Sequence, residues 1–392
     1  MKIQKTILLG GLLIITCAVH GQGRLGINTN TPRAGLDVKH PDGIIATGTF
    51  GAGNTSNLPS DAGTSLLWIP KLAAFRAGQV DNVQWFVGNI GEGSVAMGIN
   101  VQAQKKYSVA MGYRNTASGE AATVFGNHNS AHGRSSTAFG EENGVDGHYA
   151  TAFGKHNQSH GLGATAFGTE NFANGQGAVA MGFHNNASGV RAFAFGTETI
   201  ASGDYSTAIG SYVSTANKTG SFIIGDALGF PQHTQVSAPN KFTARFANGY
   251  LLYSSANLTS YVALGPGGNA WISSSDSTRK TNFVKADGED FLRKVRGLRL
   301  GSWNYKQQDA ATMRHYGPMA QDFFAAYGKD LHGTIGNDTT LNTADVDGVA
   351  FILIQALEKR TMQLNREIEW LKTQLAEVSG QGIRQKLEAK RD

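Results

Sequence analysis

The chain of 392 residues has little cysteine, proline or charge. Its one cysteine excludes an internal disulfide framework and a cysteine-based zinc site within one chain. With 8 prolines it is neither collagen-like nor a proline-rich disordered chain. Charged residues make up 16%, and the net charge of +5 is too diffuse to predict nucleic-acid binding, which needs clustered Lys and Arg. Glycine is abundant instead, with 51 residues. Stability must therefore come from burial, backbone pairing or oligomerisation.

The first residues resemble an export signal. Lys2 and Lys5 give a positively charged start, and residues 7–15 form an apolar run that is too short to span a bilayer. Cleavage after Gly21 would remove a signal peptide of residues 1–21, and a lipoprotein signal at Cys17 is the alternative. No later segment has about 18 consecutive apolar residues. We therefore predict an exported protein, either secreted or at the cell surface in association with the outer membrane.

Glycine recurs every fourteen residues through the middle of the chain. One series of nine runs from Gly98 to Gly210, and a second series of seven runs from Gly119 to Gly203. Each glycine of the first series ends a short apolar strand of the type S-x-A-x-G, in which Ala often replaces the Ser and Val124 replaces one central Ala. Two tight turns and two short strands per unit predict one coil of a parallel β-roll, with the array spanning 94–225. Because one coil cannot bury both of its faces, stacking is obligatory.

The alternation within S-x-A-x-G separates small from large side chains. Ala lies on one face of each strand, and Met, Phe or Ile lies on the other. We expect the alanine columns to form a flat surface of small side chains, suited to close packing of identical rolls around an axis.

Two polar columns also follow the repeat. Alternating His and Glu occupy one column, and Asn occupies the next: Arg114, His128, Glu142, His156, Glu170, His184 and Glu198, beside Asn115, Asn129, Asn143, Asn157, Asn171 and Asn185. Metal binding or acid–base chemistry is one interpretation. We favour a structural one, in which the Asn residues adopt turns with positive φ and the alternation avoids stacking like charges. Histidines two rungs apart would lie about 10 Å from each other, too far to share a metal, so we predict no metal site.

The repeat region resembles a known family. Residues 94–225 are similar to the head of trimeric autotransporter adhesins, in which S-x-A-x-G…A-x-G units form a left-handed parallel β-roll trimer. The resemblance covers about a third of the chain. It implies a mainly β fold and a homotrimer.

The segments beside the repeats are less regular. Residues 22–93 form an N-terminal tip, and its stretch 65–91 carries Trp68, Phe75, Trp85 and Phe86. Core packing is the commoner use of such residues, and binding of a partner is the alternative. Residues 226–274 contain strand-like pieces and are predicted to form a β-rich neck.

The composition changes at residue 275, and the last part of this block is a predicted helix. Its apolar residues recur at alternating spacings of four and three: Ala350, Ile354, Leu357, Thr361, Leu364, Ile368, Leu371 and Leu375. This pattern predicts a coiled-coil seam of nearly four heptads, although packing within its own domain is the alternative.

Residues 275–392 resemble the endosialidase-type intramolecular chaperone domain of phage tail spikes and bacterial exported fibres. The matching pieces, besides the final coiled coil, are S-D-x-x-x-K-x-N at 275–282, WNY at 303–305, H-x-G-P-M-A-Q-D at 315–322 and D-x-D-G-V-A at 345–350. The resemblance implies an α+β domain that assembles a trimer and then cleaves itself off directly before the serine.

Carried over to this chain, the resemblance assigns Ser275 as the nucleophile, Lys280 as the general base and Ser274–Ser275 as the scissile bond. A serine hydroxyl needs a base to remove its proton, and a lysine can be that base only where burial lowers its pKa. A correctly docked trimer interface would supply such burial. Asn282 and His315 are candidate helpers.

The chain departs from the common family motif at two positions beside the lysine. Thr278 stands where Arg or Asn is usual, and Arg279 stands where Leu is usual. These departures bear on the efficiency of cleavage rather than on the fold.

The sequence thus favours an exported, adhesin-like homotrimeric fibre whose C-terminal domain drives trimerisation and cuts itself off. Its partners are its own copies and, as a candidate, a host or environmental glycan or protein, with no cofactor and no nucleic acid. Two alternatives stay open. One is a structural surface fibre that does not cleave, and the other is a glycan-degrading spike with an active site in the roll, which would need a pair of carboxylates in a cleft.

Overall fold

The computed structural model describes residues 24–56, 58, 61–227 and 232–390, so the predicted signal peptide at 1–21 and Cys17 lie outside the described residues. The chain divides into two compact units, with the boundary between Ser273 and Ser274. Among the residues that are described, no helix combines the length and the apolar composition needed to cross a membrane.

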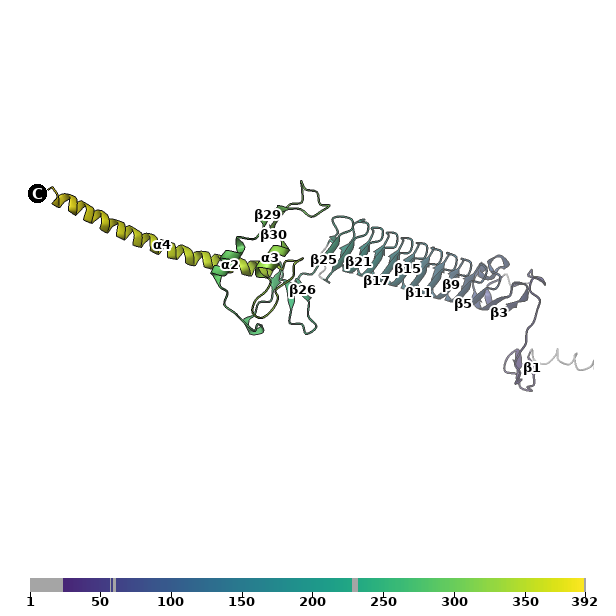
Figure 1. Cartoon of the computed structure of the whole chain (residues 1–392). Helices are drawn as coiled ribbons and strands as arrows, with labels where there is room; N and C mark the ends of the chain where they lie inside the picture. Colours follow the sequence, from purple (N-terminus) through teal and green to yellow (C-terminus); the bar gives the residue numbers. More distant parts are fainter. Residues whose placement is uncertain (1–23, 57, 59–60, 228–231, 391–392) are drawn as a thin grey trace, which may run out of the picture. The chain divides into compact units, whose positions relative to one another are not determined.

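Two stacks of parallel strands form a β-roll in the first unit, with each coil of the chain adding one strand to each sheet (Figure 1). The larger sheet consists of β3 (Gly63–Ile69), β4 (Ala74–Val80), β5 (Val95–Ile99), β7 (Val109–Tyr113), β9 (Thr123–Asn127), β11 (Thr137–Glu141), β13 (Thr151–Lys155), β15 (Thr165–Thr169), β17 (Val179–Phe183), β19 (Phe193–Thr197), β21 (Thr207–Ser211), β23 (Phe222–Gly225) and β25 (Phe242–Arg245).

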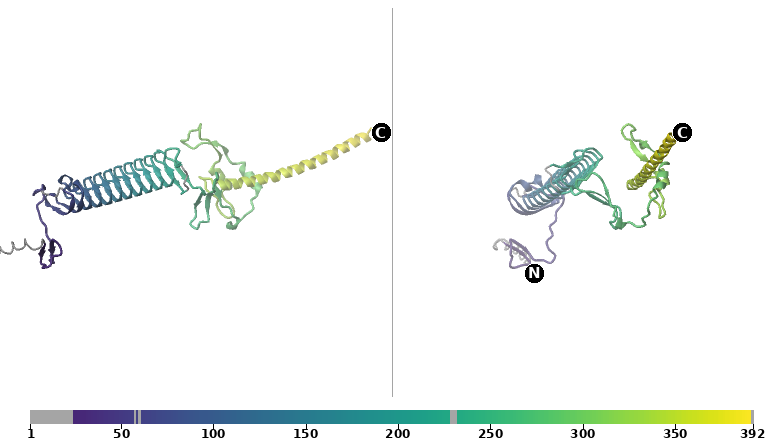
Figure 2. Two further views of the ribbon diagram at one scale, coloured as in Figure 1. Left: turned by 180° about the vertical axis from the view of Figure 1, so that it is seen from behind. Right: turned by 90° about the vertical axis from the view of Figure 1, so that its left-hand side faces the viewer.

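The smaller sheet contains strands of two residues. They are β6 (Gln102–Ala103), β8 (Thr116–Ala117), β10 (Ser130–Ala131), β12 (Gly144–Val145), β14 (Gln158–Ser159), β16 (Phe172–Ala173), β18 (Asn186–Ala187), β20 (Ile200–Ala201), β22 (Val213–Ser214) and β24 (Thr234–Gln235). The predicted parallel β-roll is confirmed. The successive coils are also visible when the molecule is turned (Figure 2).

The period of fourteen fixes the register of the roll, because each residue of a long strand pairs with the residue fourteen positions later. Gly140, for example, is opposite Gly154. Its φ is +122°, and a Cβ there would collide with the carbonyl oxygen of Gly154. Glycine is therefore required at this position both for its backbone conformation and for the close approach of the next coil.

The interior of the roll corrects the expected use of the alanine columns. The second residue of each five-residue strand, from Ala96 in β5 to Ala208 in β21, is fully buried between the two sheets. The large residues of the same strands point outward instead, and Phe167 remains 46% exposed. Because successive coils close within fourteen residues, only small side chains fit between the sheets. Alanine therefore forms the core of the roll, and it does not form a flat outer surface.

The asparagine column also differs from its prediction. Of the two polar columns, the His/Glu column is the one whose residues have positive φ, for example Glu142 at φ 55°. The asparagines lie inside the roll and form a ladder: Asn157 Nδ2 donates to Asn143 Oδ1 at 3.1 Å and to Gly168 O at 2.7 Å. The amides satisfy backbone carbonyls where the chain turns inside the roll, where water cannot reach them.

The roll begins before the first repeat. β4 pairs in parallel with β5, and β3 pairs antiparallel with β4. Arg76 on β4 occupies the alanine column and is fully buried, with its guanidinium donating to Ser94 Oγ at 2.8 Å and Ala103 O at 3.0 Å. Burial lowers the pKa of Arg76 to about 10. Trp85 is also buried and donates from Nε1 to Val101 O at 3.1 Å.

Smaller sheets complete the first unit. β1 (Leu25–Ile27) and β2 (Leu36–Val38) form a parallel pair near the N-terminus. Between the roll and Ser273, β26 (Tyr250–Tyr253), β27 (Tyr261–Leu264) and β28 (Ile272–Ser273) form a three-stranded antiparallel sheet.

The second unit combines helices with a two-stranded sheet. Its elements are η5 (Ser277–Arg279), α2 (Gly288–Val295), β29 (Leu300–Trp303), β30 (His315–Pro318), α3 (Ala320–Tyr327) and α4 (Thr343–Glu388). Its buried apolar residues, as far as the chain is described, are Leu292, Phe323, Tyr327 and Ala356. A core of this size gives one copy of the unit little apolar burial.

Candidate functional site

A short turn at the start of the second unit brings Ser275 and Lys280 together. Lys280 Nζ donates a hydrogen bond to Ser275 Oγ at 2.8 Å. The 3₁₀ turn η5 lies between them and folds the chain back, with the Lys280 amide donating to the Ser277 carbonyl at 3.2 Å. The two residues predicted to act together therefore meet within one chain, one residue after the boundary between the units.

Asp276 caps this turn. Its Oδ1 accepts hydrogen bonds from the Thr278 amide at 2.9 Å and from the Thr278 hydroxyl at 2.8 Å. The hydrogen bonds from the backbone and side chain of Thr278, aided by the positive charges of Arg279 and Lys280, lower the pKa of Asp276. The carboxylate thus stays ionised at neutral pH and satisfies the amide of Thr278, the second residue of the turn.

The turn is open to solvent in a single chain. Ser275 and Lys280 are both exposed. Shortly after the lysine, Phe283 is 92% exposed and Val284 is also exposed. Two adjacent apolar side chains are therefore exposed to water close to the Ser275–Lys280 pair.

The two candidate helpers are placed differently from the pair. Asn282 is an exposed residue with φ 55°, and its side chain makes no hydrogen bond in the described structure. His315 lies on β30 beside Trp303, with ring centroids 4.9 Å apart, and its Nε2 is 3.1 Å from Gln308 Oε1. Neither residue is joined to Ser275 by a contact among the described residues, and His315 belongs to an aromatic cluster.

The His/Glu column lies on the surface of the roll, and some of its members pair with a neighbour in the column. His184 Nδ1 is 2.8 Å from Glu198 Oε1, and His156 contacts Glu142. In a neighbouring column Asp146 lies between His132 at 2.7 Å and His160 at 3.3 Å. Across the described part of the chain, no three His, Cys, Asp or Glu side chains gather into a metal-binding group. The pairing agrees with the structural interpretation of the column.

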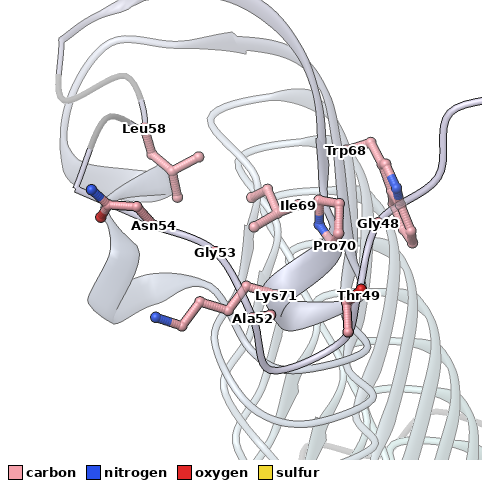
Figure 3. Close-up of a pocket in the computed structure, with 10 residues that line it drawn as sticks. All are labelled: Gly48, Thr49, Ala52, Gly53, Asn54, Leu58, Trp68, Ile69, Pro70 and Lys71. Carbon is pink, nitrogen blue, oxygen red and sulfur yellow. The ribbon is translucent and has the colours of Figure 1, made fainter.

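The tip carries a pocket of about 340 Å³ next to the first strand of the larger sheet (Figure 3). Thr49, Trp68 and Pro70 lie on one side of it, and Asn54 and Leu58 lie on the other. Of the predicted aromatic residues of the tip, Trp85 is buried, whereas Trp68 is 47% exposed. Since Trp68 also continues the outward surface of the sheet, the pocket does not by itself favour a small ligand over a neighbouring chain.

The large residues of the long strands form an outer column along the roll. The column consists of Met97, Met111, Phe125, Phe139, Phe153, Phe167, Met181, Phe195 and Ile209. Neighbouring rings stack, with the Phe139 and Phe153 centroids 4.9 Å apart and nearly parallel. A continuous apolar column of this length on a protein surface is typical of an interaction site.

The predicted seam of the last helix is likewise uncovered. α4 contacts α2 near its start, where Gly288 approaches Ala356, and Arg360 Nη2 lies 2.6 Å from Glu289 Oε2. The seam itself faces away, with Ile354 61% exposed and Leu375 71% exposed. The side of the helix that faces α2 is thus used within the unit, and the predicted seam is not packed against another element among the described residues.

Two protein-family models match the chain. The model described as YadA head domain repeat matches residues 90–114, 103–129, 131–157, 159–185 and 187–212, with two copies of the repeat. The model described as chaperone of endosialidase matches residues 275–331. No curated protein matches the chain. Both matches agree with the resemblances found from the motifs.

The two matches together suggest an adhesin-like trimeric fibre with a chaperone domain. Head repeats of this kind suggest an exported protein of the cell surface. The chaperone match covers Ser275, Lys280 and His315, and it ends before α4.

Sequence reasoning missed two features of the site. The bond between Asp276 and Thr278 could have been inferred from the Asp-x-Thr spacing, which is typical of an Asx turn. The outward position of the Phe and Met column could not be inferred from alternation alone, which separates two faces without telling which is inside.

Proposed function

We propose that the protein is an exported homotrimeric fibre whose second unit drives assembly and then cleaves the chain once, between Ser274 and Ser275. The observation that carries the proposal is the 2.8 Å hydrogen bond from Lys280 Nζ to Ser275 Oγ in the first turn of the segment that matches the chaperone model. The enzyme activity is thus a single-turnover serine endopeptidase that acts on its own chain.

Two uncovered apolar surfaces support the homotrimer. The outer column of the roll and the seam of α4 are both exposed in one chain, and both repeat regularly along their elements. Burying such surfaces against identical copies removes apolar area from water, with roughly 25 cal/mol for each Å² buried. A rotationally symmetric arrangement lets each copy present the same column and the same seam to its neighbours.

The chemistry follows from the position of the serine directly after the scissile bond. Lys280, as the neutral amine, accepts the proton of Ser275 Oγ while the oxygen attacks the carbonyl carbon of Ser274. The bond between that carbon and the Ser275 nitrogen breaks, the nitrogen takes the proton, and an ester joins Ser274 to Ser275 Oγ. Water then hydrolyses the ester, which leaves a carboxylate on Ser274 and a free hydroxyl and amine on Ser275.

Assembly would control this reaction through solvent exposure. A lysine in water keeps its proton at neutral pH and is a poor general base. In one chain Lys280 is exposed, and so are Phe283 and Val284. Covering these apolar residues with neighbouring copies would also exclude water from the lysine and make it a better base. Cleavage would then report that the trimer has formed.

Intact mass measurement of the freshly expressed full-length protein tests the proposal. We expect the wild type to yield the fragment 275–392, and Ser275→Ala and Lys280→Ala to stay whole while still forming trimers. Ser277→Ala and Lys285→Ala are matched controls that remove a nearby hydroxyl or amine, and both should be cut like the wild type. An assembled wild-type trimer that stays intact would instead establish the non-cleaving fibre, and undiminished cleavage of Ser275→Ala would exclude this nucleophile.

A further inference from the structure

The turn that carries the proposed site also contains a carboxylate that could pair with the amine of the lysine. Asp276 lies four residues before Lys280, and the charges of Arg279 and Lys280 both act on its carboxylate. A carboxylate that pairs directly with an amine favours the protonated amine, which cannot act as a general base. In a Ser–Lys site an aspartate at this position therefore opposes catalysis unless its side chain is directed elsewhere.

The structure shows where that carboxylate goes. Oδ1 of Asp276 accepts both the amide and the hydroxyl of Thr278, so the side chain is turned into the 3₁₀ turn. Within the described residues Lys280 Nζ has Ser275 Oγ as its hydrogen-bond partner, and no ion pair joins it to Asp276. The hydrogen bond from the backbone amide would form with any residue except proline at position 278, whereas the hydrogen bond from the hydroxyl depends on Thr or Ser there.

We propose that Thr278 is a positioning residue, which acts through Asp276 by holding the carboxylate in the turn and keeping Lys280 available to Ser275. The inference rests on the proposed self-cleavage and adds to it a reason for the residue at position 278. The hydrogen bonds of the Thr278 amide and hydroxyl go to Asp276, so its effect on Lys280 passes through the aspartate.

Removing only the hydroxyl tests this role. Thr278→Val keeps the shape of the side chain and the hydrogen bond from the backbone amide. It removes the hydrogen bond from the hydroxyl to the Asp276 carboxylate. We expect the carboxylate to reach Lys280 more often, so that the pH of half-maximal cleavage rate rises by about one unit and the rate at neutral pH falls about tenfold. Thr278→Ser keeps a hydroxyl and should restore the wild-type pH profile.

The same substitution in an Asp276→Asn background separates positioning from simple support of the turn. An Asn side chain accepts the same two hydrogen bonds but has no charge with which to pair the lysine. If Thr278 acts on the charge, Thr278→Val should shift the pH profile when residue 276 is Asp and leave the profile in place when it is Asn. An equal shift in both backgrounds, or none in either, would overturn the proposal.

The rate is measured on the full chain by a short pulse of cell-free synthesis, followed by a chase in buffers of increasing pH and separation of the intact chain from the fragment 275–392. Trimer formation by each variant is checked in the uncleavable Ser275→Ala background by sedimentation. If the wild type is never cut, the proposed function fails, whereas a wild type that is cut with a pH profile unaffected by Thr278→Val rejects only the role of Thr278.

Discussion

Single glycines determine how closely the coils of the roll can stack. Gly140 has a φ of +122°, which lies outside the conformations that a residue with a Cβ adopts readily. An added Cβ would in addition collide with the Gly154 carbonyl of the next coil. Gly163 has positive φ as well, at +64°, but no atom lies within 4 Å of the position its Cβ would take.

This contrast predicts unequal costs for the same substitution. Gly140→Ala adds backbone strain and a steric clash, so we expect it to destabilise the roll by about 3 to 5 kcal/mol. Gly163→Ala only places an alanine in the left-handed conformation, which we expect to cost about 1 to 2 kcal/mol of stability. Circular dichroism during thermal or denaturant unfolding, with both variants in the Ser275→Ala background, compares the two. Equal losses would mean that close stacking does not depend on Gly140.

At the scale of the element, the buried asparagine ladder ties the coils together. The amide and Nδ2 of Asn157 donate to Asn143 Oδ1, its Nδ2 also donates to Gly168 O, and its Oδ1 accepts from the amide and Nδ2 of Asn171. Each amide thus satisfies groups on the coils before and after its own, in an interior that water does not reach.

Removing one rung of the ladder should be costly. Asn157→Ala leaves buried donors and acceptors on three coils without partners, so we expect a loss of roughly 2 to 4 kcal/mol. Asn174→Ala is the control, because Asn174 is exposed and accepts a bond from His160 Nδ1 on the surface, and its replacement should change stability by about 0.5 kcal/mol or less. Denaturant titration of both variants measures the difference, and a negligible effect of Asn157→Ala would contradict the role of the ladder.

The sequence predicted the elements of the roll better than its faces. The glycine period alone determines that residues fourteen apart pair, as Gly140 and Gly154 do. Alternation places Ala138 and Phe139 on opposite faces of the strand. Which face is buried depends on the distance between the two sheets of the roll, and the strand pattern does not give that distance. For the same reason Asn143 was expected at a turn with positive φ, although its neighbour Glu142 adopts that conformation.

The candidate site was predictable in part because its two residues are close in the sequence. Lys280 follows Ser275 by five positions, and a single turn capped by Asp276 suffices to join them. His315 is forty positions after Ser275. The motif around it is explained equally well by the packing of its ring against Trp303. Distant helpers depend on tertiary packing, which no local pattern encodes.

At the scale of the whole molecule, each unit leaves an apolar surface exposed. The first unit exposes the outer column of the roll, and the second exposes the seam of α4 and Phe283. The second unit has few buried apolar residues in one chain, so little apolar burial stabilises it alone. We infer that the seam of α4 brings three chains together, and that the covered Ser–Lys turn follows from this association.

Placing one charge on the seam tests this dependence. Ile368→Asp puts a carboxylate where three helices would meet, which we expect to abolish the trimer and, with it, cleavage after Ser274. Gln363→Asp places the same charge on the exposed side of the same helix and should leave both unchanged. Sedimentation in the Ser275→Ala background reports the trimer, and intact mass in the otherwise wild-type chain reports cleavage. Cleavage by a monomeric Ile368→Asp chain would separate the chemistry from assembly, because the exposed turn of one chain would then be sufficient to cut it.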